Sequence, residues 1–133
     1  MKTFLALTSL LLGAAAPLMA HDGHNHEAAT ETAPHGGTLR NAGDYKAEIV
    51  INGDNLKLYI FDKQLKPMKL EKAELTGDVQ FPKEKSKPVT FKKAGEFYSA
   101  TVKGISKVHR YDMHVNLEVA GKKVVADFGI DNI

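Results

Sequence analysis

The 133-residue sequence contains no cysteine and no tryptophan, and its formal net charge is only +2. Without cysteine there can be no disulfides, thiolate zinc sites, iron–sulfur clusters or cysteine nucleophiles. A net charge this small gives no general attraction to nucleic acid. With 43% hydrophobic and 26% charged residues, the composition is that of one small soluble domain. The metal chemistry that stays open uses histidine, carboxylate, amine or methionine ligands.

Residues 1–20 have the layout of a secretory signal peptide. Lys2 supplies a positive start, an apolar stretch follows, and the segment ends in the small residue Ala20. The apolar stretch is shorter than the roughly 20 residues that a membrane span needs. We therefore predict a periplasmic protein that is cleaved after Ala20, begins at His21 and has no membrane span after processing.

Residues 21–36 combine histidines and carboxylates without any large apolar side chain. A segment of this composition cannot bury enough surface to offset the entropy of ordering it, so we predict a disordered tail. Imidazole and carboxylate groups suit copper, zinc, nickel or cobalt where no thiolate is available. The sequence therefore predicts that this tail binds a divalent transition metal ion, with copper and zinc ahead of nickel and cobalt. The candidate ligands in the tail are His21, Asp22, His24, His26, Glu27 and His35.

Cleavage after Ala20 would let His21 hold one ion through both its α-amine and its imidazole, an arrangement that copper(II) favours. It resembles the ligation of periplasmic copper carriers and of copper-dependent polysaccharide monooxygenases. The chain is small for such an oxygenase and has no tryptophan to form a polysaccharide platform. It also lacks a nucleophile-elbow motif and a glycine-rich phosphate loop. We therefore predict that the protein is not an enzyme. A copper–oxygen enzyme that uses His21 is a third alternative, after the metal carrier and the docking module described below.

Residues 37–133 show the period-two alternation of half-buried β-strands. The longest alternating run covers residues 111–119, and Asn-Gly-Asp-Asn at residues 52–55 supplies hairpin turn chemistry. About seven short strands without an amphipathic helix predict an all-β fold, a single antiparallel β-sandwich. The expected strands cover residues 45–52, 56–61, 73–81, 89–91, 97–102, 111–119 and 124–130.

A second candidate metal site lies in the alternating run. Asp112 and His114 are two residues apart and fall on the face opposite to the apolar side chains. They could supply two ligands to an ion at the surface. His109 falls on the other face, at the start of the strand, and is expected to be a rim residue.

The many lysines suggest an alternative function of another class, in which the protein docks to other proteins and does not bind metal. Nine lysines lie between Lys63 and Lys93, against four carboxylates. Such lysines often block pairing at the edges of sheets, but they could also contact an anionic membrane surface or an acidic protein surface. The alternative is a β-sandwich interaction module that docks to an efflux adaptor or another envelope protein without metal, with the tail as a passive linker.

Short motifs at the start of the predicted sandwich resemble those of a known group of proteins. The motifs are His35-Gly36-Gly37, Gly43-Asp44-Tyr45, Glu48, Leu58-Tyr59-Ile60-Phe61-Asp62 and Pro67. In them the chain, from about residue 34 to its end, resembles small periplasmic heavy-metal-associated β-domain proteins. It is also similar to extra domains of periplasmic adaptor subunits in heavy-metal efflux pumps.

The resemblance implies a periplasmic β-domain that handles copper, zinc, nickel or cobalt. It implies that His35, Glu48 and Asp62 are the polar residues of the pattern. Lys46 stands where the pattern often has histidine, and we expect this cation to oppose metal binding by Glu48. The leading hypothesis is a binding protein that captures the ion on its tail and buffers it or delivers it to an efflux pump adaptor.

Overall fold

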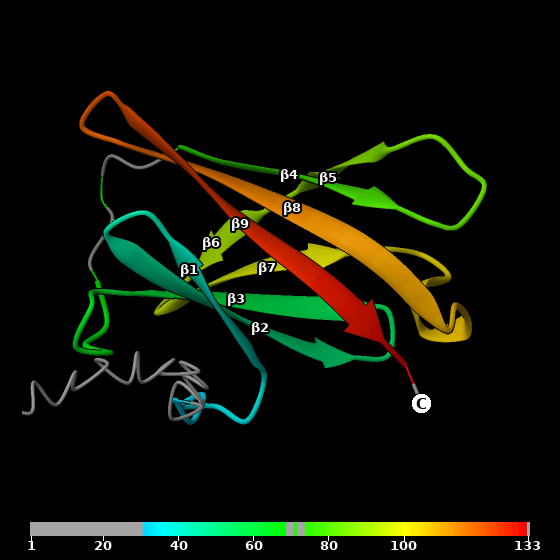
Figure 1. Cartoon of the computed structure of the whole chain (residues 1–133), viewed down its shortest axis with the longest axis horizontal. Helices are drawn as coiled ribbons and strands as arrows, with labels where there is room; N and C mark the ends of the chain where they lie inside the picture. Colours follow the sequence, from blue (N-terminus) through cyan, green and yellow to red (C-terminus); the bar gives the residue numbers. More distant parts are fainter. Residues whose placement is uncertain (1–30, 69–70, 72–73, 133) are drawn as a thin grey trace, which may run out of the picture.

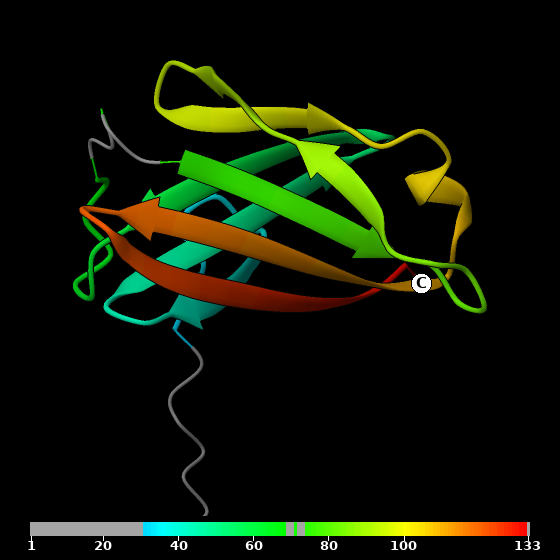
Figure 2. The ribbon, with the colours of Figure 1, turned by 90° about the horizontal axis from the view of Figure 1, so that it is seen from above.

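The computed structural model describes residues 31–68, 71 and 74–132, which form two antiparallel β-sheets packed face to face (Figures 1 and 2). One sheet has the strand order β1-β2-β3-β7-β6, and the other has the order β5-β4-β8-β9. The elements are β1 (Thr38–Ala42), β2 (Tyr45–Asn52), β3 (Asn55–Phe61), β4 (Glu74–Gln80), β5 (Lys87–Thr90), β6 (Lys92–Ala94), β7 (Phe97–Thr101), the 3₁₀ turn η1 (Ile105–Lys107), β8 (Arg110–Val119) and β9 (Lys122–Asp131). The predicted all-β antiparallel sandwich is confirmed.

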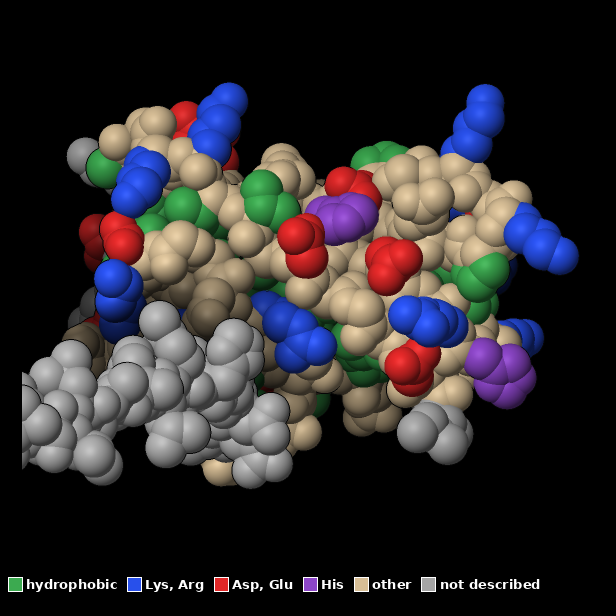
Figure 3. Space-filling view, viewed as in Figure 1, with side chains coloured by type: hydrophobic (Ala, Val, Ile, Leu, Met, Phe, Trp, Pro, Cys, Tyr) green, Lys and Arg blue, Asp and Glu red, His purple; other side chains and the backbone are tan. Residues whose placement is uncertain are grey.

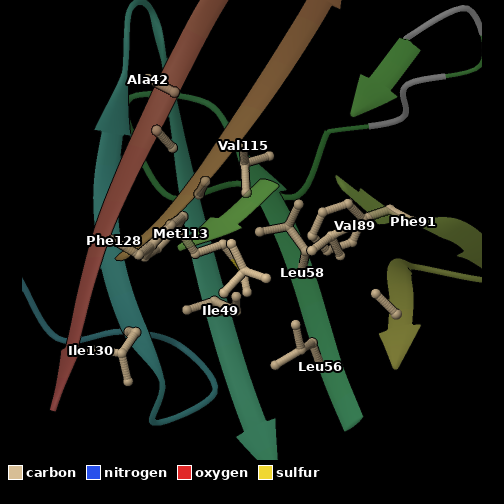
Figure 4. Packing of buried hydrophobic residues seen from close by; sticks show 14 of the residues in the cluster. Ala42, Ile49, Leu56, Leu58, Val89, Phe91, Met113, Val115, Phe128 and Ile130 are labelled. Carbon is tan, nitrogen blue, oxygen red and sulfur yellow. The ribbon is translucent and has the colours of Figure 1, made fainter. Parts of the chain in front are cut away.

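The hydrophobic core lies between the two sheets because every second side chain of the long strands points inward. In β8 and β9 buried and exposed residues alternate along most of each strand. Burying one such aliphatic or aromatic side chain contributes about 1.5–3 kcal/mol. The residues that pack across the two layers include Ile49, Leu56, Leu58, Met113, Val115 and Phe128 (Figure 4).

Two features of the fold differ from the expected strands. Strand β1 was not expected, since its sequence Thr-Leu-Arg-Asn-Ala has no period-two pattern; it pairs with β2 through a short turn at Gly43. The expected strand at 89–91 is the junction of β5 and β6, which belong to different sheets. The chain crosses between the layers at Phe91, whose ring is buried. Residue 73, the expected start of the third strand, is outside the described residues.

Helical structure in the described ranges is limited to the turn η1. No helix in those ranges is long and apolar enough to cross a membrane.

Candidate functional site

The structure places the predicted site residues in two separate regions. His35 lies just before β1, at the outer face of the five-stranded sheet, whereas Asp112 and His114 lie on β8 in the other sheet. The remaining candidate ligands, His21, Asp22, His24, His26 and Glu27, lie outside the described residues, as does the expected signal peptide. Metal binding by those residues stays a prediction.

His35 is joined to the sheet by the carboxylate of Glu48 on β2. Its backbone N–H donates to Glu48 Oε1 at 2.9 Å, and its Nδ1 lies 2.9 Å from Glu48 Oε2. The backbone N–H of Gly37 donates to Glu48 Oε1 at 2.8 Å. Glu48 is fully buried, with 0% of its surface exposed. His35 was predicted to belong to the tail, but these bonds fix it to the folded domain.

The two glycines after His35 make this arrangement possible. Gly36 has a φ of +74°, a left-handed conformation that glycine adopts without steric cost. Gly37 lies so close to β2 that an added Cβ would be 2.3 Å from the carbonyl oxygen of Ile49. The resulting turn lays residues 35–37 over β2, where their N–H groups reach Glu48.

Two aromatic rings of β3 also lie against the imidazole of His35. Its imidazole stacks on Tyr59 with ring centroids 3.7 Å apart and an interplanar angle of 11°, and the ring of Phe61 lies 6.0 Å away. Tyr59 is the cross-strand partner of Glu48, so one row of the sheet supplies both contacts. The His35 side chain keeps 39% of its surface exposed. The imidazole is therefore held in one orientation while more than a third of the side chain stays open to solvent.

Lys46, which we expected to oppose metal binding by Glu48, forms an ion pair with a different carboxylate. The Lys46 ammonium pairs with the carboxylate of Glu31, and its side chain is only 12% exposed. The oxygens of Glu48 are themselves buried and accept hydrogen bonds from N–H donors. The contacts Glu31–Lys46 and His35–Glu48 together pin residues 31–37 along the outer face of β2.

Asp62, the third polar residue of the motif pattern, stabilises a turn. Its Oδ1 accepts hydrogen bonds from the backbone N–H groups of Gln64 and Lys66, both at 2.9 Å. Such an aspartate-capped turn satisfies backbone groups that a loop would otherwise leave unpaired. Asp62 therefore has a structural role at the end of β3.

The second region is a cross-strand row of charged groups on the outer face of the four-stranded sheet. His114 on β8 stands directly opposite Asp78 on β4 and Asp127 on β9. Its Nδ1 lies 2.9 Å from Asp78 Oδ1, and its Nε2 lies 3.7 Å from Asp127 Oδ1. Figure 3 shows a histidine surrounded by acidic side chains on this face. Asp78 also accepts a hydrogen bond from the Ser86 hydroxyl.

When it is protonated, His114 therefore forms ion pairs with both Asp78 and Asp127. The hydrogen bond to Asp78 raises the pKa of His114, and the charges of Asp127 and Asp112 raise it further. The pKa of Asp78 is lowered first by its hydrogen bond with His114. Asp112 and His114 share a face, as predicted, but in the described residues no three histidine, aspartate or glutamate side chains are placed to hold one metal ion.

Replacing His114 by glutamine is expected to lower the free energy of unfolding at pH 5.5 more than at pH 8.5. The raised pKa of His114 gives stability that is fully present below its ordinary value of 6.5 and is lost as the pH rises through the folded value. The lowered pKa of Asp78 gives stability that is present above 3.8 and lost at lower pH. Because both groups are partly exposed, the loss at pH 5.5 should stay below about 1 kcal/mol.

Urea unfolding of His114→Gln at the two pH values measures this difference. His109→Gln is the matched control, since His109 is exposed and its side chain forms no ion pair within the described part of the chain. An equal loss at both pH values would show that the imidazole charge contributes nothing.

Sequence reasoning missed most partners of the two histidines. Asp78 and Asp127 come from other strands, and only the strand register places them beside His114. Glu48 and Tyr59 were noticed as parts of a motif, but their contact with His35 depends on the glycine turn. No signal in the local sequence could have revealed this contact, since β2 also carries Lys46 and Asn52, and a glutamate on its outward side is expected to meet solvent.

No protein-family model and no curated protein sequence matches the chain. Among solved structures, the chain is similar to the crystal structure of a DUF4426 family protein from Pseudomonas aeruginosa. The two share 14% sequence identity over 71% of this chain and 94% of that chain, with a TM-score of 0.49. The candidate site therefore rests on its own geometry.

Proposed function

We propose that this protein is a periplasmic, non-enzymatic carrier of a divalent transition metal ion, with copper or zinc as the first candidates. It captures the ion on the histidine-rich segment at residues 21–35 and buffers it or delivers it to the adaptor of a heavy-metal efflux pump. The ion is the cargo of the protein. The residues of this chain supply its ligands.

One observation carries the proposal: the imidazole of His35 is fixed to the domain at the end of the histidine-rich segment. Its Nδ1 is bonded to a buried carboxylate and its ring is stacked on Tyr59. A ligand that is already oriented loses little conformational entropy when it binds. His35 lies nine residues after His26, and the entropy cost of closing a flexible loop grows only slowly with its length. Imidazoles from the segment can therefore share one ion with His35.

The experiment is calorimetry with zinc and copper(II) on the processed protein and on a variant in which His21, His24 and His26 are replaced by alanine. The affinity of the variant should fall by at least about 100-fold, because loss of an outer partner of a ligand alone costs about 10–100-fold. His109→Ala is the matched control, since it removes a histidine that lies far from this segment in the chain.

Equal affinity of the triple variant and the unchanged protein would remove the segment from the mechanism. No uptake by the unchanged protein at micromolar metal and neutral pH would reject the carrier function. In that case capture of an efflux adaptor that is insensitive to chelators would favour the docking module.

A further inference from the structure

The oxygens of Glu48 act as hydrogen-bond acceptors. The backbone N–H groups of His35 and Gly37 can only donate, and both point at Oε1, at 2.9 and 2.8 Å. The His35 N–H also lies 3.2 Å from Oε2. Both carboxylate oxygens therefore accept from backbone N–H groups. In the remaining contact, 2.9 Å between Oε2 and His35 Nδ1, the donor that matches an accepting oxygen is Nδ1–H.

This bond decides which nitrogen of His35 has a lone pair. A neutral imidazole carries one N–H, so a proton on Nδ1 leaves Nε2 as the acceptor. Nε2 points away from Glu48, on the far side of the ring, and it forms no hydrogen bond with any other described residue. The contact with Glu48 fixes which edge of the ring faces the carboxylate, and the stacking on Tyr59 holds the plane of the ring.

We propose that Glu48 is a positioning residue for the metal ion: it holds the proton of His35 on Nδ1 and so presents Nε2 as the ligand that joins the ion to the folded domain. The inference rests on the proposed function. The same pairing of a carboxylate with the second nitrogen of a ligating imidazole fixes the tautomer and the ring orientation at metal sites generally. Glu48 thus acts on the ion through His35 and does not touch it.

Glu48→Gln tests the proposal because it keeps the shape of the side chain and reverses one hydrogen bond. The amide oxygen can take the place of Oε1 and accept from the two backbone N–H groups, while the amide nitrogen takes the place of Oε2 and donates to Nδ1. The proton of the imidazole then moves to Nε2, the position that the ion needs. Zinc affinity should fall by about 10–100-fold without loss of the fold.

Two measurements are made on the processed protein. Correlation of imidazole ¹⁵N and carbon-bound ¹H signals gives the tautomer of His35 without metal, and calorimetry gives the affinity for zinc. We expect Nδ1–H in the unchanged protein and Nε2–H in Glu48→Gln. Asp62→Asn is the matched control, since Asp62 also accepts two backbone N–H bonds but has no contact with His35. In this variant the tautomer of His35 and the affinity of the protein for zinc should both stay unchanged.

Predominant Nε2–H in the unchanged protein would overturn the proposal, and so would an unchanged zinc affinity in folded Glu48→Gln. If the variant does not fold, the tautomer of the unchanged protein decides, together with zinc affinity in His35→Gln, which should show a similar loss. Zinc binding with no effect of either variant rejects the role of Glu48 and leaves the carrier function. No zinc binding by the unchanged protein rejects both.

Discussion

Replacing Gly37 by alanine is expected to destabilise the domain by about 3 kcal/mol and to detach His35 from Glu48. An added Cβ would lie 2.3 Å from the Ile49 carbonyl oxygen and 2.9 Å from Val50 Cγ2. Backbone cannot yield as the end of a flexible side chain can, so residues 35–37 must move away from β2. Thermal unfolding should show a decrease in Tm of about 10 °C or more, and the imidazole signals of His35 should move toward those of an exposed histidine.

Gly36→Ala is the control that separates contact from backbone strain. Gly36 has a φ of +74°, but nothing lies within 4 Å of the position that its Cβ would take. Alanine there pays only the cost of the left-handed conformation, about 1–2 kcal/mol. If Gly37→Ala were no more destabilising than Gly36→Ala, close packing of this turn on β2 would not be what holds His35.

Alternation of side chains made most of the sandwich predictable from sequence. Residues 111–119 alternate strictly, and β8 spans Arg110–Val119 with the apolar side chains inward. The prediction failed at β1, where pairing with β2 and not hydrophobic pattern defines the strand. The prediction also failed at residues 89–91, where the chain crosses between the sheets at Phe91. Such a crossing has the same short apolar sequence as a buried strand. Alternation within a segment therefore predicts the strands of the sandwich, whereas the edge strand β1 is defined only by its pairing with β2.

The candidate site was predictable in its residue types but not in its contacts. Glu48 falls on the side of β2 that faces away from the core, a position expected to meet solvent. It is buried because residues 35–37 fold back over it, and that depends on a turn eleven or more residues earlier in the chain. The partners of His114 were hidden for the same reason, because the register of three strands brings them together.

Lowering the pH from 7.5 to 5 is expected to reduce the zinc affinity of the processed protein about a thousandfold. Protons compete with the ion for the imidazoles of His21, His24 and His26, and the ordinary pKa of an imidazole is about 6.5. Each imidazole ligand then loses about 30-fold over this range, and two ligands lose about a thousandfold. A carrier built on histidine would therefore release its cargo in an acidic compartment. Calorimetry at half-unit pH intervals gives the slope, and circular dichroism at each pH confirms that the sandwich stays folded.

His114→Gln is the control for this experiment, because the pair of His114 with Asp78 also titrates as the pH falls. If the ion is held near His35, the variant should give the same slope as the unchanged protein. A slope that flattens in His114→Gln would move the site to the outer face of β8. An affinity that does not change between pH 7.5 and 5 would mean that carboxylates hold the ion, since their ordinary pKa values lie near 4, and the role of the imidazoles would be rejected.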